Sequence, residues 1–115
     1  MSKNLAWSVC CVLLLVAIRA QAQTATGVIQ GTISDSSGAM IVGARVTLTD
    51  QGTNQTREQA TNPAGIFEFR ALARGNYRLE AEQSGFKKEV LTDITLQVAE
   101  TRNFQMTLAV GEVTE

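Results

Sequence analysis

Apolar and polar residues alternate with a period of two along most of the chain after residue 22, and short turn motifs separate the alternating segments. Residues 29–34 and 44–49 are two of these segments, and the turn motif Asp35-Ser36-Ser37-Gly38 follows the first. No segment after residue 22 keeps apolar residues at the i, i+3, i+4, i+7 spacing of an amphipathic helix. Because alternation places one row of side chains on each face of a strand, the pattern predicts an all-β domain.

The segment TNPAGIFEFRALARGNYRLEA, residues 61–81, contains two such strands and two turn signals. Asparagine, proline and glycine in residues 62–65 favour the first turn, and Gly75 is expected at the second turn with a positive φ. The alternation predicts that four side chains of this segment point into the core: Phe67, Phe69, Tyr77 and Leu79.

Residues 55–61, QTREQAT, contain threonines that suit a strand but almost no apolar face. We therefore predict an edge strand that is wet on both faces. The free backbone donors and acceptors of such an edge can pair with a strand of another chain. The favoured alternative is that Arg57 and Glu58 prevent this pairing, because the sequence indicates no apolar pocket beside the edge.

Three more alternating segments complete the chain, around residues 88–91, 94–98 and 104–108. The total is seven or eight strands, with turn signals every 8 to 12 residues. This spacing is typical of a β-sandwich, in which two sheets stack about 10 Å apart and bury alternate residues of each strand. Most aromatic residues after residue 22 fall at the positions expected to face inward.

The first residues have the pattern of a secretory signal peptide. Lys3 precedes an apolar block of 14 residues, Leu5–Ile18, and Ala20-Gln21-Ala22 places small residues where a signal peptidase cleaves. A membrane-spanning helix needs about 20 apolar residues, so a retained membrane helix is the poorer interpretation. The predicted division of the chain is a helical signal peptide (1–22), a β-sandwich (23–110) and a tail (111–115), with cleavage between Ala22 and Gln23.

Cleavage removes Cys10 and Cys11, so the mature chain is expected to fold outside the cytoplasm without a disulfide. Its 93 residues are enough for one small domain with a hydrophobic core. Loss of Lys3 and Arg19 leaves 8 basic and 11 acidic residues, a net charge of −3. Nucleic acid and anionic lipid are therefore poor partners, because both require a basic face. The mature sequence contains no transmembrane segment.

The chain has no histidine and, after cleavage, no cysteine. This excludes Ser-His-Asp and Cys-His nucleophile systems and histidine zinc sites. Glu80 and Glu82 share one strand face, as an acid–base pair would, but Arg78 on the same face indicates a solvated surface. The motif at residues 35–38 offers oxygen ligands for calcium but lacks further acidic residues, so an ordinary turn is favoured. We predict no catalytic residue, no metal site and no cofactor.

Carbohydrate recognition on a sandwich usually needs an exposed aromatic platform. The only tryptophan, Trp7, is removed with the signal peptide. Tyr77 and Phe86 are the remaining candidates for an aromatic surface, and Tyr77 has an inward register. The sequence therefore offers little capacity to stack on sugars.

Five segments resemble the carboxypeptidase regulatory-like domain. They are Ile29–Asp35 (IQGTISD), Gly43–Leu48 (GARVTL), Thr61–Phe69 (TNPAGIFEF), Leu72–Tyr77 (LARGNY) and Gly85-Phe86. The resemblance covers about residues 27–110 and implies a transthyretin-like, Greek-key sandwich. In outer-membrane proteins this domain often precedes the plug and barrel of TonB-dependent receptors.

The resemblance implies a non-enzymatic interaction domain in the periplasm or at the outer membrane, with a protein partner in the cell envelope. A carbohydrate-binding sandwich module is the alternative, and a glycan is then the ligand. The chain stops at Glu115, where receptor relatives continue toward the plug. A barrel needs many more strands. We therefore expect the amino-terminal module of a truncated receptor or a free-standing secreted domain.

The sequence departs from the family pattern at three positions. Val42, Ala73 and Arg74 stand where the family commonly has proline, so looser turns are expected. Related adhesin sandwiches carry an isopeptide bond from a lysine of the first strand. Lys87 and Lys88 instead follow a turn, and the first strand has no lysine, so no such bond is expected.

Overall fold

The computed structural model describes residues 25–111, none of which is helical. These residues form seven strands, so the predicted all-β class is confirmed. The predicted signal peptide, its cleavage site at Ala22 and Gln23, and residues 112–115 lie outside the described residues. The strands are β1 (Gly27–Asp35), β2 (Arg45–Asp50), β3 (Thr56–Ala60), β4 (Ile66–Leu72), β5 (Gly75–Glu82), β6 (Glu89–Leu96) and β7 (Thr101–Leu108).

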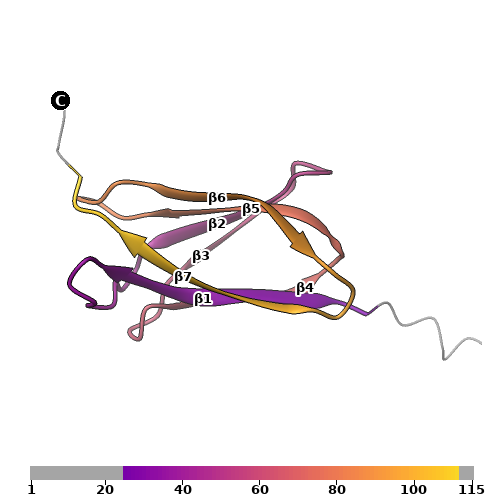
Figure 1. The fold of residues 1–115 in the computed structure, drawn as a ribbon, viewed down its shortest axis with the longest axis horizontal. Coiled ribbons are helices and arrows are strands. Elements are labelled where there is room, and N and C mark those ends of the chain that lie inside the picture. Colours follow the sequence, from indigo (N-terminus) through magenta and orange to yellow (C-terminus); the bar gives the residue numbers. More distant parts are fainter. Residues whose placement is uncertain (1–24, 112–115) are drawn as a thin grey trace, which may run out of the picture.

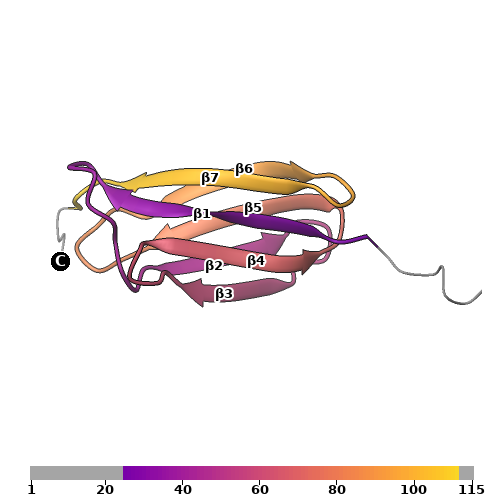
Figure 2. The ribbon, with the colours of Figure 1, turned by 90° about the horizontal axis from the view of Figure 1, so that it is seen from below.

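The strands form a sandwich of two sheets, as predicted, with the orders β4-β1-β7 and β3-β2-β5-β6 (Figure 1). β1 and β7 pair in parallel, whereas the other paired strands are antiparallel. Because β1 and β7 run in the same direction, the sandwich begins at one end of its long axis and β7 finishes at the other end (Figure 2). The alternation in the sequence carried no signal for this parallel pair, since pairing depends on which strands meet in space.

The core lies between the two sheets and consists of the inward rows of side chains from all strands except β3. Phe67, Phe69, Tyr77 and Leu79 are 1%, 2%, 4% and 0% exposed, so their predicted burial is confirmed. The remaining buried apolar residues are Ile29, Ile33, Ile41, Ala44, Val46, Leu48, Leu72, Ala81, Ile94, Leu96, Met106 and Leu108. Full burial of one large apolar side chain stabilises the fold by about 1.5–3 kcal/mol.

Gly31 of β1 permits the close approach of β1 to β7. A Cβ atom at this position would overlap the carbonyl oxygen of Phe104 and lie 2.9 Å from the Phe67 ring. Gly31 lies between the buried residues Ile29 and Ile33, and neighbouring atoms occupy the space that a side chain at this position would need. At the second turn of the 61–81 segment, Gly75 has the predicted positive φ, with a value of 158° that is close to extended backbone.

The structure corrects three details of the predicted strands. The segments around 88–91 and 94–98 form one strand, β6, which remains continuous through an irregularity in its pairing with β5 and a positive φ at Asp93. Seven strands result rather than eight. Val98 is 54% exposed and lies in the following turn, where Glu100 donates to the carbonyl of Gln97 and accepts from its backbone N–H.

The third correction concerns Thr61, which was assigned to the wet edge strand but is only 4% exposed. Its hydroxyl donates to the carbonyl oxygen of Ile41 at 2.6 Å and accepts from the N–H of Ala44 at 2.9 Å. These two bonds satisfy a hydroxyl that burial would otherwise penalise. Thr61 therefore fixes the start of the β3–β4 connection against the chain that leads into β2.

Candidate functional site

β3 is the edge strand of the four-stranded sheet and pairs only with β2 within the described residues. All five of its residues are exposed, which confirms the prediction of an edge that is wet on both faces. The other six strands each bury at least two side chains. β3 is therefore the strand whose side chains are least committed to the core.

Hydrogen bonds at the two ends of the β2–β3 ladder show which backbone groups of β3 are free. The N–H of Asp50 donates to the carbonyl of Gln55, and the N–H of Thr61 donates to the carbonyl of Ala44. In an antiparallel ladder, bonded and non-bonded pairs alternate. The backbone groups of Arg57 and Gln59 therefore point to β2, and those of three residues point away from the sheet: Thr56, Glu58 and Ala60.

The neighbouring edge, β4, is capped by side chains from β3 and from the β3–β4 turn. Arg57 donates from Nη1 to the carbonyl of Arg70 at 2.6 Å, and the N–H of Glu68 donates to Oε1 of Gln59 at 2.5 Å. The N–H of Ile66 donates to Oδ1 of Asn62 at 3.0 Å. These bonds occupy groups that another strand would need, so β4 is a protected edge.

Arg57 makes a contact with β4 that was not expected from the sequence. Its guanidinium points across the open side of the sandwich and lies 5.7 Å from the centroid of the Phe69 ring. This position combines a hydrogen bond with a cation–π contact. Arg57 protects β4, whereas the backbone edge of its own strand stays free.

A second arginine closes the opposite side of the sandwich in the same way. Arg102 of β7 donates to the carbonyl of Thr95 in β6 at 2.8 Å and lies 5.4 Å from the centroid of the Phe104 ring. Beyond β7, the carbonyl of Ala109 accepts from the N–H of Lys87, and Gly111 donates to Gly85. No contact of either arginine with the opposite sheet was expected from the sequence, although alternation places each at an inward position of its strand.

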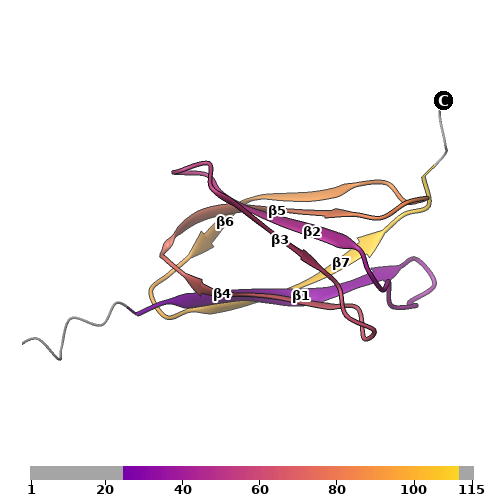
Figure 3. The same ribbon diagram turned by 180° about the vertical axis from the view of Figure 1, so that it is seen from behind.

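A hollow of about 420 Å³ lies between the start of β3 and the end of β4. β3 crosses the sandwich obliquely, and its start lies away from β4 in Figure 3. The hollow is lined by Leu48, Asp50, Gln55, Thr56, Arg57, Ala71, Leu72, Ala73 and Tyr77. Leu48, Leu72 and Tyr77 make its base apolar, because these side chains belong to the buried core. This hollow, whose lining combines five apolar residues with Asp50, Gln55, Thr56 and Arg57, was not expected from the sequence.

Two features fix the wall of this hollow. The hydroxyl of Tyr77 donates to the carbonyl of Ala73 at 2.6 Å, and burial, followed by the negative charge of Asp50, raises the pKa of this hydroxyl. Ala71 has a φ of 58°, in the left-handed region that non-glycine residues rarely adopt. Strained backbone of this kind persists only where the surrounding structure holds it, and it occurs often at binding sites.

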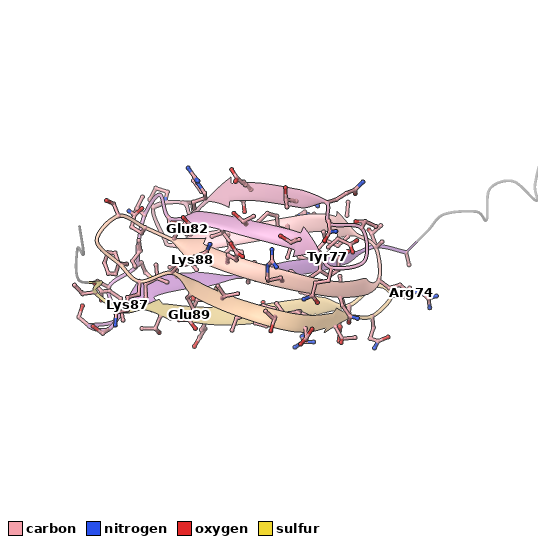
Figure 4. The ribbon with its side chains drawn as sticks, turned by 90° about the horizontal axis from the view of Figure 1, so that it is seen from above. Arg74, Tyr77, Glu82, Lys87, Lys88 and Glu89 are labelled. Carbon is pink, nitrogen blue, oxygen red and sulfur yellow. The ribbon has the colours of Figure 1, made fainter. Side chains whose placement is uncertain are left out.

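The outer face of the four-stranded sheet carries a network of ion pairs. Glu80 contacts Arg78 at 3.1 Å and Lys88 at 3.0 Å, and Lys88 also contacts Glu82 at 3.3 Å. Figure 4 shows Glu82 and Lys88 close together on this face. The hydrogen bond to Glu80, and then that to Glu82, raise the pKa of Lys88. The two glutamates are engaged with cations, in agreement with the predicted solvated surface.

A second hollow, of about 410 Å³, lies at one end of this outer face. Its lining residues are Gly43, Arg45, Glu82, Gln83, Ser84, Phe86 and Lys88. Phe86 is half-buried and packs against the core, so its ring is only partly available to a ligand. Tyr77, the other aromatic candidate, is a core residue on the opposite side of the sheet from these charges.

The motif at residues 35–38 forms a turn, as expected. Oδ1 of Asp35 accepts from the N–H and hydroxyl of Ser37 and from the N–H of Ala39, at 2.6–3.0 Å. The Ser37 hydroxyl is the largest cause that lowers the pKa of Asp35. Gly38 completes the turn with a φ of 89°. Within residues 25–111 there is no group of three or more acidic, histidine or cysteine side chains that would hold a metal ion.

The carboxypeptidase regulatory-like domain model matches residues 28–109, which include every strand of the sandwich except the first residue of β1. The chain belongs to this family. Comparison with curated protein sequences found no match. None of the described residues forms a helix that is long and apolar enough to cross a membrane.

Solved structures with the same fold differ widely in their descriptions. The TIE protein of Bacillus anthracis superposes with a TM-score of 0.64 at 19% identity, over 75% of this chain and 17% of that chain. A Bacteroides uniformis protein described as carbohydrate binding has a TM-score of 0.57 at 15% identity, over 71% of this chain and 40% of the other.

Hydroxyquinol 1,2-dioxygenase from Pseudomonas putida has a TM-score of 0.61 at 9% identity, over 79% of this chain and 58% of that enzyme. The region superposed on this chain thus covers less than two thirds of each of these proteins. The three likenesses establish a common fold for proteins of different kinds.

Proposed function

We propose that this protein is a non-enzymatic interaction domain that acts outside the cytoplasm and binds an extended segment of a protein partner along β3. The observation that carries the proposal is the free backbone of Thr56, Glu58 and Ala60 beside a hollow with an apolar base. An added strand gains main-chain hydrogen bonds from such an edge and specificity from a pocket that takes one of its side chains.

The proposed cellular setting is the periplasm or the outer membrane, in a role similar to that of the amino-terminal extension of a TonB-dependent receptor. Family membership supports this setting, together with the signal-peptide pattern of residues 1–22. The parallel β1–β7 pair also suits a domain within a longer assembly, because it places the start of β1 and the end of β7 at opposite ends of the sandwich. Candidate partners are a neighbouring envelope protein and the downstream segment of such a receptor.

Hydrogen exchange followed by NMR tests the proposal residue by residue. On binding of an envelope partner, the amides of Thr56, Glu58 and Ala60 should become protected, because they gain acceptors on the added strand. The amides of Arg57 and Gln59 already donate to β2 and should change little. If a partner binds and the three outward amides exchange as fast as before, the edge is not the docking surface.

Carbohydrate binding is the second candidate function. The hollow at Phe86 supports it, since an aromatic edge lies there beside Arg45, Gln83 and Glu82, which can hydrogen-bond sugar hydroxyls. The B. uniformis structure supports it through fold alone. A glycan array with the native domain and Phe86→Ala tests this candidate, with Val90→Ala as the control for an exposed apolar residue on the same sheet. Binding that Phe86→Ala removes and Val90→Ala retains would favour the carbohydrate function.

A further inference from the structure

We infer that the strand accepted by β3 belongs to a different polypeptide and has a stated chemistry: a lysine or arginine directly opposite Glu58, and an aliphatic side chain that enters the hollow beside Arg57. This inference rests on the proposed function, and it specifies the partner of the same site. It follows from the charges on β3, from the two faces of the strand and from the position of the hollow.

A second copy of this chain is a poor occupant of the edge. Two β3 strands that pair antiparallel about a two-fold axis with full overlap place Glu58 directly opposite Glu58 of the other copy. A shift of the register in either direction shortens the ladder. One of these shifts places Arg57 directly opposite Arg57 of the other copy. Like charges directly opposite each other destabilise a strand pair. The full-overlap register and one shift are therefore disfavoured by charge, and the other shift, with Gln59 opposite Gln59, pairs only residues 58–60 of β3. A different chain is thus the better occupant of the edge.

The need for a basic residue in the partner follows from the charge on the outer face of β3. Glu58 is exposed, lies opposite Thr47 of β2, and takes part in no ion pair within the described residues. The other glutamates with outward side chains on this sheet, Glu80 and Glu82, already contact Arg78 or Lys88. Glu58 is thus the carboxylate at the free edge that an added strand can pair with, and a cation opposite it contributes to binding.

The need for an aliphatic residue in the partner follows from the hollow on the inner face of β3. Side chains at odd positions of β3, such as Arg57, point toward the interior side of the sheet, where the hollow lies. Arg57 already donates to the carbonyl of Arg70 and packs over Phe69, so it requires no carboxylate from the partner. An inward side chain of an added strand faces the opening of this hollow, whose base includes Leu48, Leu72 and Tyr77, and an apolar side chain that enters it displaces water from that base.

A short synthetic peptide can test this chemistry without knowledge of the natural partner. The capped peptide Ser-Thr-Leu-Lys-Leu-Thr-Ser reads the same in both directions, so it presents its central lysine outward and its leucines inward in parallel or antiparallel pairing. In an NMR titration with the full domain, the amide resonances of Thr56, Glu58 and Ala60 should shift more than those of β6 or β7. The control peptide, with glutamate in place of the lysine, should bind about threefold to thirtyfold more weakly.

Two variants of the domain make the test specific. Glu58→Lys reverses the exposed charge and should reverse the preference, so that the glutamate peptide binds more tightly than the lysine peptide. Ala73→Leu fills the hollow from a position outside the strands and should weaken both peptides while the melting temperature stays within a few degrees of the native value. Raised salt should reduce the difference between the two peptides, because the charge pair is exposed.

The outcomes separate this inference from the proposed function. If both peptides bind β3 equally and Glu58→Lys does not alter their ratio, the inferred charge pairing is wrong, although strand addition is retained. If neither peptide shifts the β3 resonances while an envelope protein protects the same amides, the partner chemistry is wrong and the proposed function stands. If neither peptides nor envelope proteins affect β3, both are wrong.

Discussion

Replacement of Phe69 by alanine is the most direct test of the core. Phe69 is 2% exposed, its ring centroid lies 6.1 Å from that of Phe67, and the guanidinium of Arg57 lies 5.7 Å from its ring. The substitution removes the ring from the core and deprives Arg57 of the surface on which it rests. It therefore affects both the packing between the sheets and the capping of β4.

The expected loss of stability is large for a domain of this size. Removal of a buried phenylalanine side chain costs about 3–5 kcal/mol, and the aromatic pair with Phe67 places the value toward the upper end. The total stability of a small domain is about 5–15 kcal/mol. Since 1 kcal/mol corresponds to about 4–8 °C in a domain of this length, the melting temperature should fall by about 12–40 °C.

Thermal unfolding monitored by circular dichroism measures this change. Ile66→Ala is the matched control, because Ile66 lies in the same strand but is 43% exposed, and its loss should cost about 1 kcal/mol or less. Phe69→Leu should lie between the two, since leucine refills part of the space. A melting temperature for Phe69→Ala within a degree or two of the native value would show that the assigned register of β4 is incorrect.

Three further predictions concern single positions. Gly31→Ala should abolish folding or lower the soluble yield severely, because the added carbon overlaps the Phe104 carbonyl. Gly52→Ala is the control, because the only atom near its added Cβ is a carboxylate oxygen of Asp50, at 3.3 Å. Tyr77→Phe should lower the free energy of unfolding in urea by about 0.5–1.5 kcal/mol, through loss of the bond to Ala73; no change would mean that water replaces this bond.

The third of these concerns the ionisation of Tyr77, the only tyrosine in the chain. Burial, followed by the negative charge of Asp50, raises the folded-state pKa of its hydroxyl above the ordinary tyrosine value of 10.0. A raised pKa means that folding favours the protonated form, so this contribution to stability is complete below about pH 10 and is lost as the pH rises through the folded pKa. Ultraviolet titration should give a midpoint for the folded domain above that of the chain unfolded in urea, and equal midpoints would contradict the burial of this hydroxyl.

Several outcomes were determined by the sequence alone. The alternation of residues 61–81 assigned Phe67, Phe69, Tyr77 and Leu79 to the core, and the structure confirms all four. The polar segment at residues 55–61 specified an edge, because a strand without an apolar row has no place between two sheets. Alternation failed at the end of β6. Val98 continues the apolar pattern of Ile94 and Leu96, but it lies in the turn after the strand and is 54% exposed. The pattern of apolar residues does not show where the strand ends, because an exposed apolar residue after the strand extends the same alternation.

Only the tertiary structure decided which edges are open. The parallel pairing of β1 with β7 arises from contacts between segments about 70 residues apart in the chain. The reach of Arg57 to the carbonyl of Arg70, and of Arg102 to that of Thr95, depends on the spacing of the two sheets at each open side. The hollow beside β3 exists because this strand diverges from β4, and no local pattern encodes that angle. Local periodicity fixes which side chains share a face, whereas the packing of one sheet on the other decides which backbone groups are left for a partner.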